Sequence, residues 1–427
     1  MYLKLLKNHI AASLFKNAYF LMSSSVLSSV IGYLYWISAA RLFPPEEIGF
    51  IAAVLAAASL IMSVGDLGLG ITAIRHLQSS GSNKLAMANS VITIPAVCSV
   101  LLGLVFLVLI PYLAPQYLPL VINPLYGGLF LLLAVGQSVV YSSGSIFTAL
   151  LASDRTLYLV NISAVGKLVL IAPIALMFPG SHGLIIASAL AIWIGISYSF
   201  IVSFPSIIPE FKFRFTASAN LLVPLVKYSF SNYFARICLE AQNLLFPIIS
   251  LHLMGPEKNA IFYMALITSM VLRVIPSAIF NSLFAESSND KKSSKKNLRD
   301  ALKLNFLIII PACLAIIICS EYLLVLIGEN YAKEGRNALM ILVVANIPWS
   351  INYMLITLAR VNQQNKLVIT ICVALLLSSI IPCFFFMPTW GPSGGAMAYL
   401  LGQILTMTFM FFVYGFRHYY KVKPYNE

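Results

Sequence analysis

Charged residues are scarce in this sequence of 427 residues: Asp, Glu, Lys and Arg make up 10% of it, and hydrophobic residues 60%. A soluble domain carries about 25% charged residues, so a soluble protein is excluded. The apolar runs are about 20 residues long, which indicates transmembrane helices rather than the alternating strands of a membrane barrel. We therefore expect an all-α integral membrane protein.

Motifs for catalysis, metal binding and nucleotide binding are also lacking. The six cysteines form no CxxC pair, and the five histidines are far apart in the sequence, so we expect no metal site or disulfide framework. The glycine-rich stretch Gly65–Gly70 follows no strand and precedes no lysine, which argues against a nucleotide loop. No large loop is available to surround an acceptor sugar. We expect a protein that is not an enzyme and has no cofactor.

The net charge of +13 does not indicate a nucleic acid partner, because surplus Lys and Arg in a membrane protein usually lie in cytoplasmic loops. The apolar pattern predicts twelve spans. They cover approximately residues 14–40, 47–74, 85–110, 121–151, 156–178, 183–204, 221–251, 258–285, 301–327, 334–359, 366–387 and 394–416. Basic residues concentrate on one side of these spans, which predicts that both termini are cytoplasmic. The basic N-terminus has no small-residue cleavage site, so we expect the first helix to stay attached.

The two halves of the chain resemble each other in layout. A shift of 211 residues places LFKNAYF (Leu14–Phe20) on LVKYSFS (Leu225–Ser231), and RLFPPEEIGF (Arg41–Phe50) on HLMGPEKNAI (His252–Ile261). Six spans per half preserve orientation, so the repeats are parallel. We therefore expect two six-helix lobes, residues 1–208 and 209–427, around a central cavity. This layout suits alternating access.

One predicted span, 221–251, carries charge near its middle. Its polar residues recur at steps of three or four and so share one helix face: Ser229, Asn232, Arg236, Glu240 and Asn243. An arginine within the membrane faces a bundle interior or a wet cavity, which makes it a functional candidate. The alternative is an Arg236–Glu240 pair that neutralises itself between packed helices.

Other polar side chains lie within the predicted spans. The ionisable ones are Lys167, Arg273 and Asp66, and a polar face that includes Gln137 runs along 121–151. Most Ser, Thr and Asn residues in such spans form ordinary interhelical hydrogen bonds. The charged groups in the middle and inner part of the bundle are mainly basic, which favours an anionic ligand. A cation exporter is expected to hold more buried acids than bases.

The sequence resembles a known family in two stretches. KNAYFLMSSSVLSSVIGYLYWISAARLFPPEEIGF (Lys16–Phe50), followed by GDLGLGITAIR (Gly65–Arg75), is similar to the start of Wzx-type polysaccharide flippases. These flippases belong to the multidrug/oligosaccharidyl-lipid/polysaccharide (MOP) exporter superfamily. Twelve spans in two lobes match as well. Lipid II flippases usually carry two further C-terminal helices, so we expect this chain to lie outside that branch.

The resemblance implies translocation of an undecaprenyl-diphosphate-linked oligosaccharide across a bacterial inner membrane, for O-antigen or capsule synthesis. Its partners are then the lipid-linked anionic substrate, membrane lipids and polysaccharide-assembly proteins. Candidate substrate contacts are Arg236, Arg273, Lys167, Asn232, Asn243 and Gln137. Asp66 and Glu240 are candidates for proton or sodium coupling, or for pairing with Arg75 and Arg236. The alternatives are a multidrug exporter of the same fold, or a membrane-embedded polymerase or acyltransferase.

Overall fold

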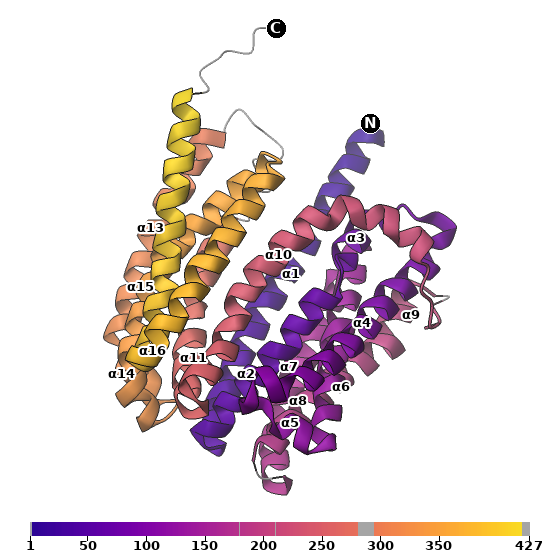
Figure 1. Cartoon of the computed structure of the whole chain (residues 1–427). Coiled ribbons are helices and arrows are strands. Elements are labelled where there is room, and N and C mark those ends of the chain that lie inside the picture. The colour runs from indigo at the N-terminus through magenta and orange to yellow at the C-terminus, as the bar shows by residue number, and fades with distance from the viewer. Residues whose placement is uncertain (1, 179, 210, 281–293, 421–427) are drawn as a thin grey trace. The chain divides into compact units, whose positions relative to one another are not determined.

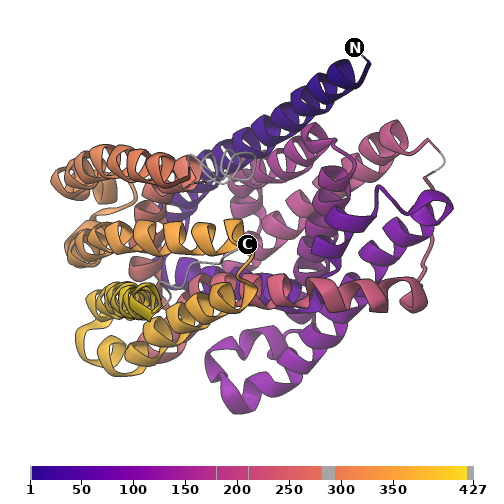
Figure 2. The same ribbon diagram turned by 90° about the horizontal axis from the view of Figure 1, so that it is seen from above.

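The computed structural model describes residues 2–178, 180–209, 211–280 and 294–420. Within these ranges the regular elements are helices, and no β-strand occurs (Figures 1 and 2). The first half contains α1 (Tyr2–Leu42), α2 (Pro45–Gly65), α3 (Leu69–His76), α4 (Lys84–Leu113), α5 (Pro119–Ile122), α6 (Pro124–Ala149), α7 (Ser153–Met177), α8 (Ser181–Tyr198) and α9 (Phe204–Ile207). A π-helical turn over Ser199–Ser203 joins α8 to α9.

The second half contains α10 (Ala219–Met254), α11 (Pro256–Met270), α13 (Ser294–Ile318), α14 (Ser320–Val325), α15 (Glu329–Val361) and α16 (Asn365–Tyr420). A 3₁₀ turn over Val271–Arg273 follows α11. The long α16 consists of two helices, because Gly391 has a non-helical φ of 56° between them.

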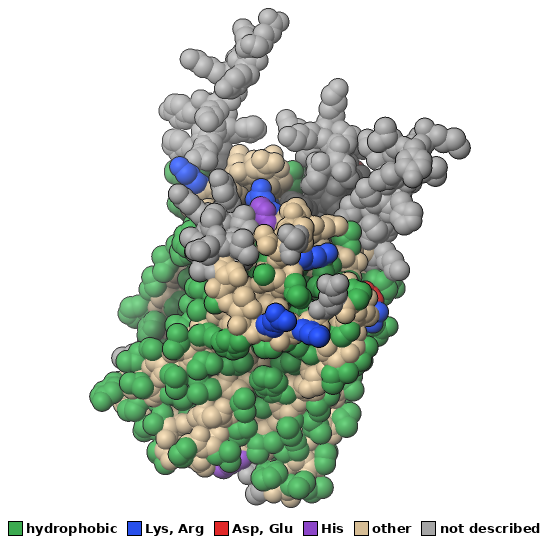
Figure 3. Space-filling model, turned by 90° about the vertical axis from the view of Figure 1, so that its right-hand side faces the viewer, with side chains coloured by type: hydrophobic (Ala, Val, Ile, Leu, Met, Phe, Trp, Pro, Cys, Tyr) green, Lys and Arg blue, Asp and Glu red, His purple; other side chains and the backbone are tan. Residues whose placement is uncertain are grey.

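Eleven helices among the described residues are long and apolar enough to cross a membrane. The last of these covers both predicted spans 366–387 and 394–416, since the kink at Gly391 lies between them. The all-helical class is therefore confirmed. The eleven helices correspond to the twelve predicted spans, of which the span 258–285 ends outside the described residues. Large hydrophobic side chains such as Leu176 and Leu307 are exposed, as lipid-facing residues are. Figure 3 shows one such face, with hydrophobic side chains over its lower part and basic ones above them.

Contacts divide the chain into two compact units. The first unit comprises Met1–Glu240 and Gly255–Ala260, and the second comprises Ala241–Met254 and Ile261–Glu427. In the first unit, α6 packs against α2, α3, α4 and α8, while α7 packs against α1 and α8. In the second unit, α15 packs against α13, α14 and α16 (Figures 1 and 2). The helix α10 contributes its first part to one unit and its last part to the other.

The sequence repeat reappears in the helix boundaries. Pro45 and Pro256, which the repeat aligns, are the first residues of α2 and α11. Proline suits the first helical position because its missing N–H has no partner there in any case. The acidic residues Glu46 and Glu257 come next and favour the positive end of the helix dipole. Both halves thus begin their second long helix with the same local signal.

The predicted span 47–74 is not one continuous helix. α2 ends at Gly65, and α3 begins at Leu69 after a turn in which Leu67 and Gly68 have φ values of 51° and 80°. Hydropathy does not distinguish a broken apolar helix from an intact one, so the sequence pattern predicted a single span. The break is the structural basis of the site described next.

Candidate functional site

The break between α2 and α3 places a carboxylate against a helix start. Asp66 follows the last residue of α2, and its Oδ1 accepts a hydrogen bond of 2.9 Å from the backbone N–H of Gly70. A carboxylate is favoured at this end of a helix, where the first backbone N–H groups have no partner within the helix. Gly68 takes its left-handed conformation without a side-chain clash. The glycine-rich stretch is therefore a buried turn that fixes Asp66.

A second glycine of this stretch brings α3 against α6. A Cβ atom on Gly70 would lie 2.5 Å from Cε1 of Tyr141 and 2.9 Å from Oγ of Ser145. Contacts this short do not occur in folded proteins without rearrangement, so Tyr141 and Ser145 would have to move before position 70 could hold a side chain. The close approach holds the ring of Tyr141 beside the Asp66 turn.

Helix α10 presents three residues to this turn, at steps of three and four. The hydroxyl of Tyr233 donates a hydrogen bond of 2.6 Å to the carbonyl oxygen of Val64, in the last turn of α2. This carbonyl otherwise accepts a long hydrogen bond, 3.4 Å, from the backbone N–H of Leu67, because the helix has ended. Arg236 and Glu240 follow on the same face. Tyr233 thus stabilises the broken end of α2 and sets the position of the two charged residues.

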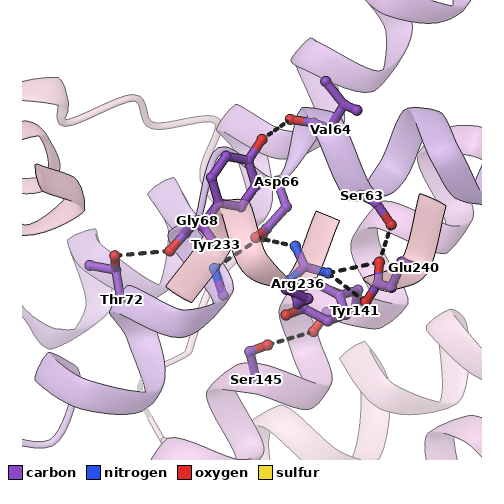
Figure 4. Close-up of polar contacts among 11 residues, drawn as sticks. Ser63, Val64, Asp66, Gly68, Thr72, Tyr141, Ser145, Tyr233, Arg236 and Glu240 are labelled. Carbon is purple, nitrogen blue, oxygen red and sulfur yellow. Dashed lines mark hydrogen bonds and ion pairs between the residues drawn. The ribbon is translucent and has the colours of Figure 1, made fainter. Parts of the chain in front are cut away.

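Arg236 is the centre of a charge cluster (Figure 4). Its Nη2 lies 2.9 Å from Oδ2 of Asp66, and its Nη1 lies 3.1 Å from Oε1 of Glu240. Ser63 donates a hydrogen bond to the other oxygen of Glu240. The guanidinium carbon also lies 4.5 Å from the ring centroid of Tyr141, a favourable cation–π distance. The cluster joins α2, α6 and α10 within the first unit.

Exposure differs between the two carboxylates. The side chain of Asp66 is 1% exposed and that of Glu240 is 35% exposed. The Asp66–Arg236 pair is therefore desolvated, and loss of Arg236 would leave the Asp66 carboxylate buried without compensation. Loss of Asp66 would still leave Arg236 paired with Glu240. Glu240 keeps access to solvent or to a ligand.

The net charge around Arg236 differs from the one expected from the sequence. The i,i+4 pair with Glu240 is present, and Asp66 is bound by the same guanidinium. One cation thus faces two carboxylates, and these disfavour the binding of an anionic ligand at Arg236. Arg75 lies exposed near the end of α3, and among the described residues it forms no ion pair with Asp66. The pairing of Asp66 with Arg75 is replaced by pairing with Arg236.

A different basic residue, Arg273, lacks a carboxylate partner in the part of the chain that is described. It follows α11 in the second unit, where its Nη1 donates to Oδ1 of Asn243 at 2.9 Å and its Nε donates to Oδ1 of Asn346 at 3.2 Å. Both acceptors are neutral. The Nη2 atom is buried, and it has no hydrogen-bond partner among the described residues.

Two aromatic rings flank the Arg273 guanidinium. Its carbon lies 5.1 Å from the ring centroid of Trp349 and 5.2 Å from that of Tyr399. Asn346 is held in turn, because its amide donates to the carbonyl oxygens of Ser269 and Leu342. The arginine is thus fixed in position without being neutralised. Such a group retains its positive charge for an anion.

The remaining candidates lie in the first unit. Lys167 and Gln137 line a cavity of about 690 Å³ within it, together with Tyr141 and Ser145. Asn232 lies exposed on α10, one turn before Arg236, and it is not among the residues that contact Arg236 in the cluster. Apart from Asn232, the predicted substrate residues are therefore distributed over three places: the Arg236 cluster, the Arg273 site and the Lys167 cavity.

The sequence matches the family described as polysaccharide biosynthesis protein over residues 39–335. This match covers well over half of the chain. The chain belongs to the polysaccharide biosynthesis protein family. The broken α2, the Asp66 turn and Arg236 all lie within the matched region of this family member. A search of curated proteins returned no match.

Solved structures with the same fold are transporters. The polysaccharide biosynthesis protein is similar to the lipid II flippase MurJ in an inward closed conformation, with a TM-score of 0.72 and 17% identity, over 92% of this chain and 87% of that one. An inward-facing multidrug resistance MATE family transporter of the MOP superfamily gives a TM-score of 0.68 and 13% identity, over 92% and 94% of the two chains. These likenesses establish the MOP-type fold.

A third similar structure is a MOP superfamily transporter from Pyrococcus furiosus, described as having a binding pocket of reverse polarity that suggests a different function. Its TM-score is 0.61 and its identity 13%, over 94% of this chain and 95% of that one. One fold thus holds pockets of different charge. The charges of the present chain must be interpreted from its own residues.

Proposed function

We propose that this protein is a flippase that moves an undecaprenyl-diphosphate-linked oligosaccharide from the inner to the outer leaflet of a bacterial inner membrane. The observation that carries the proposal is the polysaccharide biosynthesis family match over residues 39–335 on a MOP-type transporter fold. The product would be O-antigen, capsule or a related surface glycan. In this proposal two six-helix lobes alternate access to a central cavity, and both termini are cytoplasmic.

Arg273 is the residue we assign to the anionic part of the substrate. A diphosphate or an acidic sugar supplies the acceptors that its unpaired Nη2 lacks, and guanidinium is well suited to phosphate oxygens. Asn243 and Asn346 hold the group in place from two other elements. The neutral partners matter, because a carboxylate in their place would compete with the substrate.

Asp66 and Glu240 are the groups we assign to ion coupling. Their cluster contains one more carboxylate than guanidinium, so a proton or a sodium ion would balance its charge. Glu240 is the more accessible of the two, and therefore the one that a cation from solvent reaches first. Arg236 keeps both carboxylates in place and is no longer assigned to substrate contact.

The proposal is tested by deleting the gene and locating the lipid-linked repeat unit. Accumulation of this unit on the cytoplasmic leaflet, reversed by the wild-type gene, is the expected result. Normal surface glycan without accumulation would refute the proposal.

A multidrug exporter remains the competing function, because the fold is shared with a multidrug resistance transporter. The same deletion strain separates the two functions. Greater sensitivity to cationic drugs, together with unchanged surface polysaccharide, would select the exporter.

A further inference from the structure

The first unit contains a cavity that shares one residue, Tyr141, with the Arg236 cluster and none with the Arg273 site. Its volume is about 690 Å³, and its walls come from α1, α2, α3, α6, α7 and α8. Pockets for drug-sized ligands measure about 300–1,000 Å³, so this cavity has room for a ligand of that size. Its wall is largely apolar and includes Leu55, Met62, Ile74, Val140 and Val160.

One ammonium group faces this apolar wall. Among the described residues that line the cavity, Lys167 on α7 is the single Lys, Arg, Asp or Glu. It forms no hydrogen bond or ion pair with the described part of the chain. A charged group within a membrane protein needs a partner or water, and the protein supplies no carboxylate here. The site therefore carries one uncompensated positive charge.

A second donor lies in the same cavity on α6. The Oε1 atom of Gln137 accepts a hydrogen bond of 2.6 Å from the hydroxyl of Ser59. This contact fixes the amide so that its NH₂ group is the part left for a ligand. Lys167 and Gln137 thus offer donors from two neighbouring helices. Acidic oxygens accept from both kinds of donor.

We propose that this cavity binds an anionic amphiphile, a molecule with an apolar chain next to a single acidic head group such as a phosphate or carboxylate. Lys167 binds the acidic group, Gln137 donates to it, and the apolar wall covers the chain. A cationic drug is disfavoured, because it would meet an ammonium and no carboxylate among the described residues that line the cavity. Binding of an anionic amphiphile in this cavity does not require the protein to be a flippase. Only the identification of the natural ligand as the transported lipid rests on the proposed function.

Trp36 gives the cavity its own spectroscopic probe, because it is one of the lining residues. The full-length protein is placed in nanodiscs of zwitterionic lipid and titrated with dodecyl phosphate carrying bromine on its chain, which quenches tryptophan fluorescence on contact. The Trp36→Phe variant identifies the quenching that arises in the cavity. Dodecyl trimethylammonium and dodecyl maltoside, brominated in the same way, test the need for negative charge.

The expected result is saturable quenching by the phosphate, lost in Trp36→Phe and weak with the other two amphiphiles. Lys167→Met should weaken binding by about tenfold or more, as loss of a charge-assisted hydrogen bond predicts, whereas Lys167→Arg should retain it. Ala164→Phe fills the apolar space one turn from Lys167 and should also weaken binding. Lys258→Met removes an exposed lysine of the same unit and should leave binding unchanged.

Equal affinity of the wild type and Lys167→Met for dodecyl phosphate overturns the inference, and so does equal quenching by the cationic amphiphile. Competition then separates two sources of the same chemistry. Displacement by an isoprenyl-diphosphate oligosaccharide assigns the cavity to the transported lipid, and displacement by phosphatidylglycerol alone assigns it to a resident membrane lipid. Neither result depends on the gene-deletion assay, so failure of the flippase proposal would be seen separately.

Discussion

The guanidinium of Arg236 lies 2.9 Å from the carboxylate of Asp66, although 170 positions separate the two residues. The contact joins α10 to the break between α2 and α3. It also makes Arg236 the shared partner of two acids. The expected effects of substitutions at Asp66 and Arg236 on stability follow from that arrangement.

Asp66→Asn should destabilise the protein by about 2 kcal/mol, because Arg236 and the backbone N–H of Gly70 both lose a charged hydrogen-bond acceptor, while Arg236 stays paired with Glu240. The side chain is almost fully buried, so solvent cannot replace the lost carboxylate. Thermal unfolding of the purified protein in detergent measures the change. Asp154→Asn is the matched control, because Asp154 pairs with Arg155 at 3.3 Å in a half-exposed position. This variant should lose less than about 1 kcal/mol of unfolding free energy. Similar losses in the two variants would contradict a special role for the Asp66 contact.

The losses of unfolding free energy caused by Arg236→Met and by Asp66→Asn should not be additive. Arg236→Met leaves Asp66 buried without a cation, and the double variant removes that charge as well. We expect a coupling free energy of about 1–3 kcal/mol in a double-mutant cycle of unfolding. The exposed pair Arg336–Glu321, at 3.0 Å, gives the control cycle and should couple by less than about 1 kcal/mol. Additive losses in the Arg236 cycle would show that the two groups do not interact.

Arg273→Gln should reduce glycan export by about tenfold or more, the effect of losing one charge-assisted contact to substrate. Glutamine keeps much of the side-chain length and removes the charge. Surface polysaccharide is quantified in a deletion strain that carries each variant at equal protein level. Arg336→Gln changes an exposed arginine and should export normally. Wild-type export by Arg273→Gln would remove Arg273 from the substrate path.

Gly70→Ala should destabilise the protein by about 1–3 kcal/mol, the range for overpacking a close contact. The added methyl would meet the ring of Tyr141 at 2.5 Å. Gly128→Ala is a stringent control, because nothing lies within 4 Å of a Cβ at that position in α6, and alanine is the better helix former. It should be neutral or stabilising. The prediction fails if both variants unfold at the same temperature.

Much of the fold was accessible from the sequence because its signals are local. Apolar length predicts the spans, and the repeat places Pro45 and Pro256 at matching helix starts. The pair of Arg236 with Glu240 follows from their spacing on one helix. The spans and the ion pair need only neighbouring residues, and the repeat needs only a comparison of the two halves of the sequence.

The Asp66 contact could not be predicted in the same way. It depends on a helix break that hydropathy does not detect, and on how α10 packs against that break. The glycines of Gly65–Gly70 were the available signal. They were weighed only as a nucleotide loop, which the missing strand and lysine argued against, and they were not interpreted as a turn. The convergence of Asn243 and Asn346 on Arg273 likewise joins three elements far apart in the chain. Charge balance at a site is a property of packing, so a count of acids and bases along the sequence did not give it.

The contact between Gly70 and Tyr141 also constrains how this sequence can change over generations. A larger residue at position 70 is acceptable where position 141 has already become smaller, and a ring at position 141 requires that position 70 stay a glycine. The two positions should therefore vary together among homologous sequences. Lineages that lose the ring at position 141 also lose the nearer of two aromatic rings beside Arg236, and keep the ring of Tyr233 at 5.9 Å.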